Sequence, residues 1–264
     1  MNTTSPIGLF DSGLGGLSIL KEIKSLLPVE QFIYYADSAN APYGEKSKAE
    51  IIDISIKNTE ILLAKGCKLV VVACNTATTN AISILRSRFK AVNFIGIEPA
   101  IKPAALESQT KEIGVLATRG TLSSALFEVN SKKYKNTTRF IEIIGDGIVE
   151  AIESNSSDSE EFLKHLNQQL EPFNQSNIDY LVLGCSHYPL ISHQIKQCLN
   201  SRIQLIDSGF AVARQTKRVL EHSGLLNTTD KPQTTKLIRN GTKASALEAV
   251  LKKIEMENYE VTNS

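Results

Sequence analysis

The most constraining stretch of this chain comprises residues 68–79 and reads K-L-V-V-V-A-C-N-T-A-T-T. Residues 69–73 form a continuous apolar, mostly β-branched run, which is typical of a strand buried on both faces of a parallel sheet. Cys74 follows at the expected end of this strand, and we expect a helix over about residues 78–89. Because ligands of open α/β sheets bind at the carboxyl ends of the strands, Cys74 stands where chemistry is expected.

A second stretch repeats this arrangement. Residues 179–189 read D-Y-L-V-L-G-C-S-H-Y-P, which again predicts a short apolar strand ending at a cysteine, Cys185. Residues 113–118 similarly mirror residues 7–12, and the interval from Gly8 to Cys74 (66 residues) is close to that from Gly114 to Cys185 (71 residues). These correspondences indicate an internal duplication of one βα module.

The alternation of strand and helix patterns predicts an α/β fold with two similar, flavodoxin-like domains, parallel sheets and an active site in the cleft between them. We expect the first domain to comprise residues 1–98 and 208–264, and the second to comprise residues 99–207. Ser47 and Glu50 form a capping box at the start of a helix over residues 48–65, and Ser157 and Glu160 a second box before a helix that ends near Leu170.

Composition excludes several classes of protein. Hydrophobic residues make up 42% of the chain and charged residues 22%, as in ordinary soluble proteins. The formal net charge is +1, so neither nucleic acid nor an anionic membrane surface is an expected partner. No apolar run approaches the roughly 20 residues of a membrane helix, and residues 1–6 do not resemble a signal peptide. We expect a cytoplasmic protein.

The four cysteines predict neither a disulfide scaffold nor a metal site. There is no C-x-x-C pair and no Cys/His spacing typical of zinc. Cys67 and Cys198 are interpreted as packing residues, which leaves the two cysteines at strand ends to be explained.

Two other strand ends carry acidic residues. Asp11 is followed by a glycine-rich turn, residues 12–16, whose open backbone N–H groups suit an anion or a carboxylate. A dinucleotide fingerprint would require a third glycine where the chain has Ser18, so that motif fails. Asp37 ends the next strand and is either an acid, base or orienting group or a turn cap.

If the two modules face each other, Cys74 and Cys185 flank one cleft. This symmetry fits a reaction in which one thiolate removes a proton from a carbon while the opposing thiol returns one to the other face. A helix N-terminus lowers a thiol pKa, so a thiolate near neutral pH is within reach. His187 could assist Cys185, and Asp11 or Asp37 could assist Cys74. The sequence therefore favours a two-base racemase or epimerase, with polar groups of Ser12, Asn75, Thr76 and Ser186 to hold a small substrate.

Two other classes of function stay open at this point. Cys185 and His187 could form the nucleophile and base of a hydrolase or transferase, although residues two apart rarely align this way on an extended chain. That function would leave Cys74 unexplained. The chain could also be a small-ligand binding protein in which both cysteines are packed strand ends.

The chain resembles the cofactor-independent glutamate racemases of the aspartate/glutamate racemase superfamily. The matching motifs appear in the family's order and span most of the first 210 residues. They are I-G-L-F-D-S-G-L-G-G (7–16), Y-A-D-S-A-N-A-P-Y-G (35–44), A-C-N-T-A-T (73–78), G-I-E-P-A (96–100), G-V-L-A-T (114–118) and G-C-S-H-Y-P (184–189).

This resemblance implies that Cys74 and Cys185 are the acid/base pair, assisted by Asp11 and His187 respectively, without pyridoxal phosphate, other cofactor or metal. It also implies a substrate site lined by Asp11, Ser12, Pro42, Tyr43, Gly44, Asn75, Thr76, Thr118, Ser186 and His187. The implied reaction interconverts L- and D-glutamate and supplies D-glutamate for peptidoglycan synthesis, in a homodimer. Aspartate or another amino acid is the alternative substrate.

The chain departs from the family pattern at two places. Ser186 stands where the family usually has threonine, which keeps the hydroxyl. Residues 142–150 read E-I-I-G-D-G-I-V-E in place of a stretch rich in Cys-Pro and Phe-Val-Pro, and only Glu150 keeps the family's glutamate. Glu150 and Asp37 are therefore expected as auxiliary residues at most.

Overall fold

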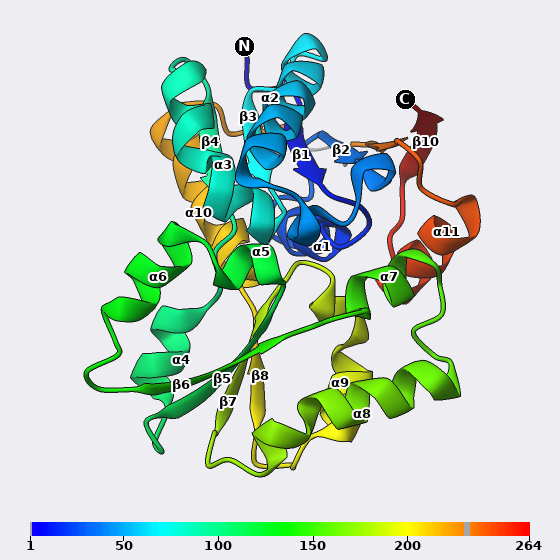
Figure 1. Cartoon of the computed structure of the whole chain (residues 1–264). Coiled ribbons are helices and arrows are strands. Elements are labelled where there is room, and N and C mark those ends of the chain that lie inside the picture. Colours follow the sequence, from blue (N-terminus) through cyan, green and yellow to red (C-terminus); the bar gives the residue numbers. More distant parts are fainter. Residues whose placement is uncertain (1, 230–232) are drawn as a thin grey trace.

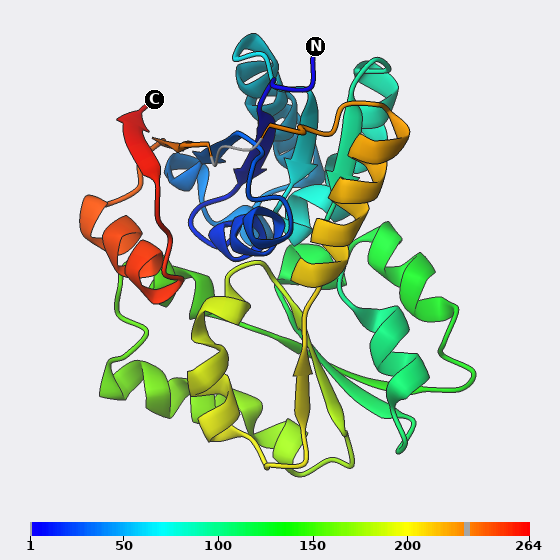
Figure 2. The same cartoon turned by 180° about the vertical axis from the view of Figure 1, so that it is seen from behind.

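The structure is a computed structural model that describes residues 2–229 and 233–264, and its strands form two parallel sheets (Figures 1 and 2). The larger sheet has the order β10-β9-β2-β1-β3-β4, with bounds β1 Ile7–Asp11, β2 Phe32–Ala36, β3 Leu69–Val72, β4 Asn93–Gly96, β9 Thr235–Arg239 and β10 Tyr259–Asn263. The smaller sheet has the order β6-β5-β7-β8, with bounds β5 Glu112–Ala117, β6 Arg139–Ile144, β7 Tyr180–Gly184 and β8 Gln204–Ile206. The predicted α/β fold with two parallel sheets is confirmed.

The two sheets repeat one topology. The order β2-β1-β3-β4 in the first corresponds to β6-β5-β7-β8 in the second, so that β3 and β7 occupy the same place. Both strands lie beside the first strand of their module, β1 and β5, and are buried on both faces. Cys74 and Cys185 therefore follow equivalent strands.

Helices cover both faces of each sheet. Those of the first sheet and its C-terminal extension are α1 Leu17–Leu26, α2 Lys48–Ala64, α3 Asn75–Arg88, α10 Gly209–His222 and α11 Ala244–Lys253. Those of the second are α4 Ile101–Glu107, α5 Arg119–Leu122, α6 Ala125–Lys132, α7 Ile148–Glu153, α8 Glu160–Asn174 and α9 Ser192–Cys198. Short 3-10 turns, η1 Ser38–Asn40, η2 Tyr43–Glu45 and η3 Tyr188–Ile191, lie in the loops. Figure 2 shows α10 returning beside the first sheet after β8.

One apolar core extends across both halves. It includes Leu9 and Leu17 of the first half together with Leu116, Ile148 and Leu183 of the second, all fully or nearly fully buried. Separate clusters fill the outer faces, one under α2 and α3 and one under α4 and α6. Buried side chains of this core thus hold the two halves together, and this packing fixes the orientation of the strand ends of one sheet relative to those of the other.

Several local predictions hold and others are corrected. The capping box of Ser47 and Glu50 is present at the start of α2. Helix α3 begins at Asn75, three residues earlier than expected, because Cys74 itself is the N-cap. Ser159, not Ser157, caps α8, because its hydroxyl accepts the N–H of Phe162. The helices α4 to α7 and the edge strand β10 were not predicted.

The chain passes between the halves at two adjacent places, after β4 and after β8. There the Ser208 hydroxyl donates to the Glu98 carbonyl, which ties the two crossings together. From the sheet membership of β9 and β10 and the packing of α10 against α1, we propose the division into residues 1–98 with 208–264, and residues 99–207.

Candidate active site

Cys74 lies at the carboxyl end of β3 and caps α3. Its backbone is extended, and its Sγ accepts the N–H of Ala77 at 3.4 Å, so the thiol takes the place of a capping hydroxyl. The Cys74 thiol also lies 3.8 Å from the Ser12 hydroxyl, to which it donates. Burial, followed by the negative charge of Asp11, raises the pKa of Cys74 far above its ordinary value, although the Ala77 N–H lowers it. The helix N-terminus thus lowers the pKa of Cys74, as the sequence suggests, but burial has the larger effect.

Asp11 lies at the end of β1, fully buried behind Cys74. The N–H groups of Gly13 (3.3 Å) and Gly16 (2.9 Å) donate to its Oδ2, and the Ser186 hydroxyl donates to its Oδ1 at 3.1 Å. The glycine-rich turn therefore does bind a carboxylate, but one that belongs to the chain itself. Burial raises the pKa of Asp11, while the nearby His187 acts in the opposite direction.

Cys185 follows β7 and lies beside His187. The chain turns into a helical conformation directly after the strand, which brings His187 Nδ1 to 3.8 Å from Cys185 Sγ. The two residues come into contact because the chain is not extended at this point, so the limit stated for an extended chain does not apply to them. The other ring nitrogen, Nε2, lies 2.7 Å from Oε1 of Glu153. Burial lowers the pKa of His187, but its hydrogen bonds to Cys185 and Glu153 outweigh that effect and hold it well above the ordinary value.

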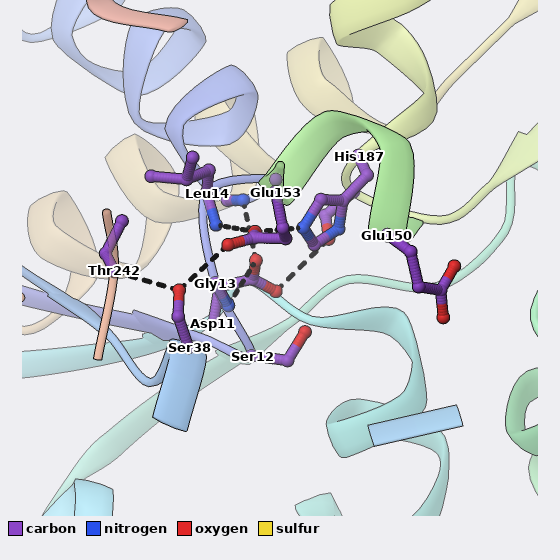
Figure 3. A network of polar contacts seen from close by, with 12 residues as sticks. Asp11, Ser12, Gly13, Leu14, Ser38, Glu150, Glu153, His187 and Thr242 are labelled. Carbon is purple, nitrogen blue, oxygen red and sulfur yellow. Dashed lines mark hydrogen bonds and ion pairs between the residues drawn. The ribbon is translucent and has the colours of Figure 1, made fainter. Parts of the chain in front are cut away.

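Glu153 is one of the residues of this site that the sequence did not reveal (Figure 3). Besides His187, its carboxylate accepts the Leu14 N–H at 2.5 Å and the Ser38 hydroxyl at 2.9 Å. Burial raises the pKa of Glu153, but these contacts, led by the one to His187, bring it below its ordinary value. The one feature of the sequence that could have indicated Glu153 is its helical spacing from Glu150, because the two residues are one turn apart on α7.

Glu150, in contrast, points away from His187 in Figure 3 and is exposed at the cavity wall. The close packing around Glu153 also explains two glycines of the turn. A Cβ at Gly13 would overlap the Glu153 carboxylate, and a Cβ at Gly15 would overlap the His187 ring.

The two cysteines line one cavity of about 340 Å³, the lower end of the size range of small-molecule sites. Cys74 is 4% exposed and Cys185 is 6% exposed, so the two thiols are similarly enclosed. The cavity brings together these residues expected from the sequence: Ser12, Pro42, Tyr43, Gly44, Cys74, Asn75, Thr76, Thr118, Glu150, Cys185, Ser186 and His187. Asp11 and Asp37 do not line it.

Asp37 lies behind the loop that carries Tyr43. Its carboxylate accepts the Tyr43 hydroxyl at 2.6 Å and the side-chain amides of Asn40, Asn58 and Asn240. Five donor contacts on one buried carboxylate leave it no free face toward the cavity. Its place therefore indicates that it fixes the loop and does not touch a substrate.

Two polar features of the wall suit a ligand. Among the described residues, neither Oδ1 nor Nδ2 of the buried Asn75 side chain has a hydrogen-bond partner, and unpaired buried amides are costly. Thr76 and Thr118 face each other across the halves, with their hydroxyls 2.8 Å apart, and Thr121 completes the cluster. These groups offer donors and acceptors to a small polar molecule.

In residues 2–229 and 233–264, no group of three or more His, Cys, Asp and Glu side chains is arranged to hold a metal ion. No helix in the same part of the chain is long and apolar enough to cross a membrane. Cys67 is buried and Cys198 half-buried, both as free thiols outside the cavity.

Comparisons with known proteins agree with this geometry. The family model Asp/Glu/Hydantoin racemase matches residues 7–216. The chain is 43% identical over 229 residues to a glutamate racemase of Herpetosiphon aurantiacus, covering 87% of this chain and 88% of the relative. It is 46% identical over 219 residues to one of Cupriavidus pinatubonensis, covering 83% and 80%.

Solved structures give the same result. A glutamate racemase isoform of Bacillus anthracis has a TM-score of 0.88 at 28% identity and covers 100% of this chain and 98% of its own. The glutamate racemase of Escherichia coli, solved with L-glutamate and an activator, has a TM-score of 0.85 at 33% identity, covering 98% and 97%. The chain therefore belongs to the Asp/Glu/Hydantoin racemase family, as an isomerase that resembles the glutamate racemases along most of its length.

Proposed function

We propose that the protein interconverts L- and D-glutamate by two-base proton transfer between Cys74 and Cys185, and that it supplies D-glutamate for peptidoglycan synthesis. One observation carries the mechanism: two enclosed thiols line the same cavity from the ends of equivalent strands.

The proton balance requires both thiols. A thiolate on one side removes the α-proton, so that a C–H bond breaks and an S–H bond forms. The thiol on the other side then gives its proton to the opposite face of the carbon, which inverts the centre. Each turnover leaves the two sulfurs in exchanged protonation states, and proton exchange with water after product release, or a turnover in the reverse direction, restores them.

The surroundings of the thiols support this assignment. Burial and the negative charge of Asp11 raise the pKa of Cys74, which favours its protonated form. The pKa of His187 is held above its ordinary value by its hydrogen bonds, and its ring lies 3.8 Å from Cys185, where a protonated imidazole attracts negative charge to the sulfur. Asp11, with its own pKa raised by burial, lies behind Cys74 on the other side.

Glutamate fits the polar wall. Its carboxylates and amino group need several donors and acceptors, and Ser12, Asn75, Thr76, Thr118 and Ser186 offer them from both halves. The unpaired amide of Asn75 is the strongest single indication of a polar ligand. The curated relatives at 43% and 46% identity are glutamate racemases, which favours glutamate over aspartate.

A Cys–His nucleophile remains the second candidate because Cys185 and His187 do lie in contact. This alternative predicts that Cys74 can be replaced without loss of turnover. The two-base mechanism predicts that neither cysteine can be replaced.

The test is incubation of the protein with L-glutamate in D₂O without added cofactor, for the wild type, Cys74→Ala, Cys185→Ala and the control Cys198→Ala. We expect loss of optical activity with deuterium at the α-carbon for the wild type and Cys198→Ala, and loss of turnover of at least about 10³-fold for the other two. Turnover of aspartate but not of glutamate would show that aspartate is the substrate and would leave the two-base mechanism unchanged. No α-proton exchange with either amino acid would overturn the racemase proposal.

The expected homodimer and cytoplasmic location belong to the same proposal. Light scattering of the purified protein measures the first, and fractionation of the native cells measures the second. A monomer that turns over at the full rate would overturn the dimer without affecting the chemistry.

A further inference from the structure

The turn after β9, residues 240–242, reads Asn-Gly-Thr and meets the loop after β2, which forms part of the cavity wall. Strand β9 pairs in parallel with β2, and Arg239 is the register partner of Ala36. Because both strands end at this pair, the residues that follow them, Asn240 and Asp37, become neighbours. The turn therefore reaches the site from a part of the chain 203 residues after Asp37.

Three hydrogen bonds hold the turn to the loop after β2. The Asn240 side-chain amide donates to Oδ1 of Asp37 at 2.6 Å. The backbone carbonyl of Asn240 accepts the N–H of Ala39 at 2.7 Å. The Thr242 hydroxyl donates to the Ser38 hydroxyl at 2.8 Å (Figure 3). The loop is thus bound both through its backbone and through its side chains.

Asp37 connects this turn to the cavity. Its carboxylate is fully buried, and its Oδ2 accepts the Tyr43 hydroxyl at 2.6 Å. The Asn58 amide donates to the same hydroxyl at 2.9 Å. Tyr43 lines the cavity, whereas Asn240, Asp37 and Asn58 do not. A change at Asn240 therefore reaches the cavity wall through Asp37 and Tyr43.

The loop after β2 has little space in which to move. It carries η2, which packs against α5 of the second half, and a Cβ at Gly44 would lie 3.0 Å from the Cβ of the cavity residue Thr118. On the side of the turn, Gly241 has a φ of 79°, and a Cβ there would lie 2.7 Å from the Ala39 nitrogen. A displacement of the turn should therefore displace the cavity wall.

We propose, on the basis of the racemase function above, that residues 240–242 are positioning residues that set the place of Tyr43 in the cavity wall and thereby the affinity for glutamate. Asn240 acts through Asp37, and Gly241 allows the turn to approach the loop closely.

The expected effect is on binding and not on the chemical step. Burial and the negative charge of Asp37 raise the pKa of Tyr43 well above its ordinary value, so the hydroxyl proton stays in the hydrogen bond to Asp37. Tyr43 thus contributes its position to the wall and no proton to the reaction. Loss of that position should raise KM and leave kcat nearly unchanged.

The first measurement is hydrogen–deuterium exchange of residues 37–46 by mass spectrometry, which does not depend on turnover. Backbone N–H groups of this segment, such as those of Ala39 and Lys46, are hydrogen-bonded. We expect Asn240→Ala to speed exchange of the segment at least about tenfold. Asn136→Ala, an exposed change before β6, is the control and should leave it unchanged. Wild-type exchange in Asn240→Ala would overturn the proposal.

Kinetics distinguish positioning from a role in stability alone. We expect Asn240→Ala to raise KM for glutamate about tenfold and to keep kcat within about threefold of the wild type. Asn240→Asp keeps the shape but replaces the donor amide by a second carboxylate beside Asp37, so its rise in KM should be at least as large. A lower unfolding temperature with wild-type KM in these variants would overturn the proposal.

Gly241→Ala and Gly66→Ala form a matched pair. The two glycines have φ values of 79° and 80°, so an added Cβ strains both backbones equally, but no described atom lies within 4 Å of a Cβ at Gly66. Both variants should lose similar stability, and Gly241→Ala alone should raise KM. The same KM in both would overturn the proposal. If the wild type does not racemise glutamate, the proposed function fails, while the exchange measurement still decides whether the turn holds the loop.

Discussion

The ends of β3 and β7 occupy equivalent places in two sheets of one topology, yet they hold their cysteines in different surroundings. Cys74 caps a helix of 14 residues and has an anionic neighbour, Asp11. Cys185 precedes a short helical turn and has a cationic neighbour, His187, backed by Glu153. Duplication explains where the sulfurs lie, but not how each is charged.

This difference suits a reaction that starts with one sulfur protonated and the other not. A strictly symmetric pair would place two like charges or two thiols in one enclosed cavity. Asp11 and His187 instead bias the two ends in opposite directions, and the Ser186 hydroxyl connects them by donating to Asp11. The asymmetry therefore defines a resting state without preventing reaction in both directions.

The largest effect should come from removal of the two charged neighbours. Asp11→Asn and His187→Asn should each lower kcat by about 10²- to 10⁴-fold, because each leaves one sulfur without its charge partner. The kinetic isotope effects of α-deuterium on the racemisation of L- and D-glutamate should then differ within each variant. We expect Asp11→Asn to raise the effect for one enantiomer and His187→Asn to raise it for the other. Asp53→Asn, an exposed change on α2, is the control.

If both variants raise the isotope effect for the same enantiomer, Asp11 and His187 do not serve opposite thiols. The different surroundings of Cys74 and Cys185 would then not give the two thiols different roles in the reaction. The description of the cavity and of the fold would not change.

A smaller effect is expected in thiol reactivity. The raised pKa of Cys74 keeps it a thiol well above neutral pH, so its alkylation by iodoacetamide should be slow and should increase with pH throughout the alkaline range. At about pH 7 we expect Cys185 to react at least about tenfold faster, because its sulfur lies 3.8 Å from the His187 ring whereas Cys74 has the carboxylate of Asp11 as its neighbour. Mass spectrometry of the modified peptides measures both rates. Similar rates with the same pH dependence would contradict the difference, since the two thiols are equally enclosed.

The sequence predicted the fold and most of the cavity wall because both depend on local patterns. Apolar runs placed β3 and β7, and polar residues directly after them became wall residues, as with Asn75 and Ser186. The helix start at Asn75 was missed because a cysteine is not an expected N-cap.

Long-range polar contacts were not predictable in the same way. Glu153 meets Leu14 and Ser38 across more than a hundred residues of chain, and no local pattern marks such a meeting. The resemblance drew attention to Glu150, which points away from His187. The sequence also could not predict that the pKa of Cys74 is raised and not lowered. This direction depends on burial, which only the packed structure determines.

The smallest effect on activity is expected from substitution of Cys67, a third buried thiol that can be compared with Cys74 and Cys185. Cys67 is as buried as Cys74 and lies just before β3, and burial raises its pKa to about 12, but its sulfur packs against Gly8 and Leu62 outside the cavity. Cys67→Ala should leave kcat and KM unchanged and lower the free energy of unfolding by about 1–2 kcal/mol, because a small void replaces the sulfur. Denaturant unfolding together with the racemase assay measures both. A fall in kcat in this variant would show that burial of a thiol near β3, and not its place at the strand end, is what the reaction requires.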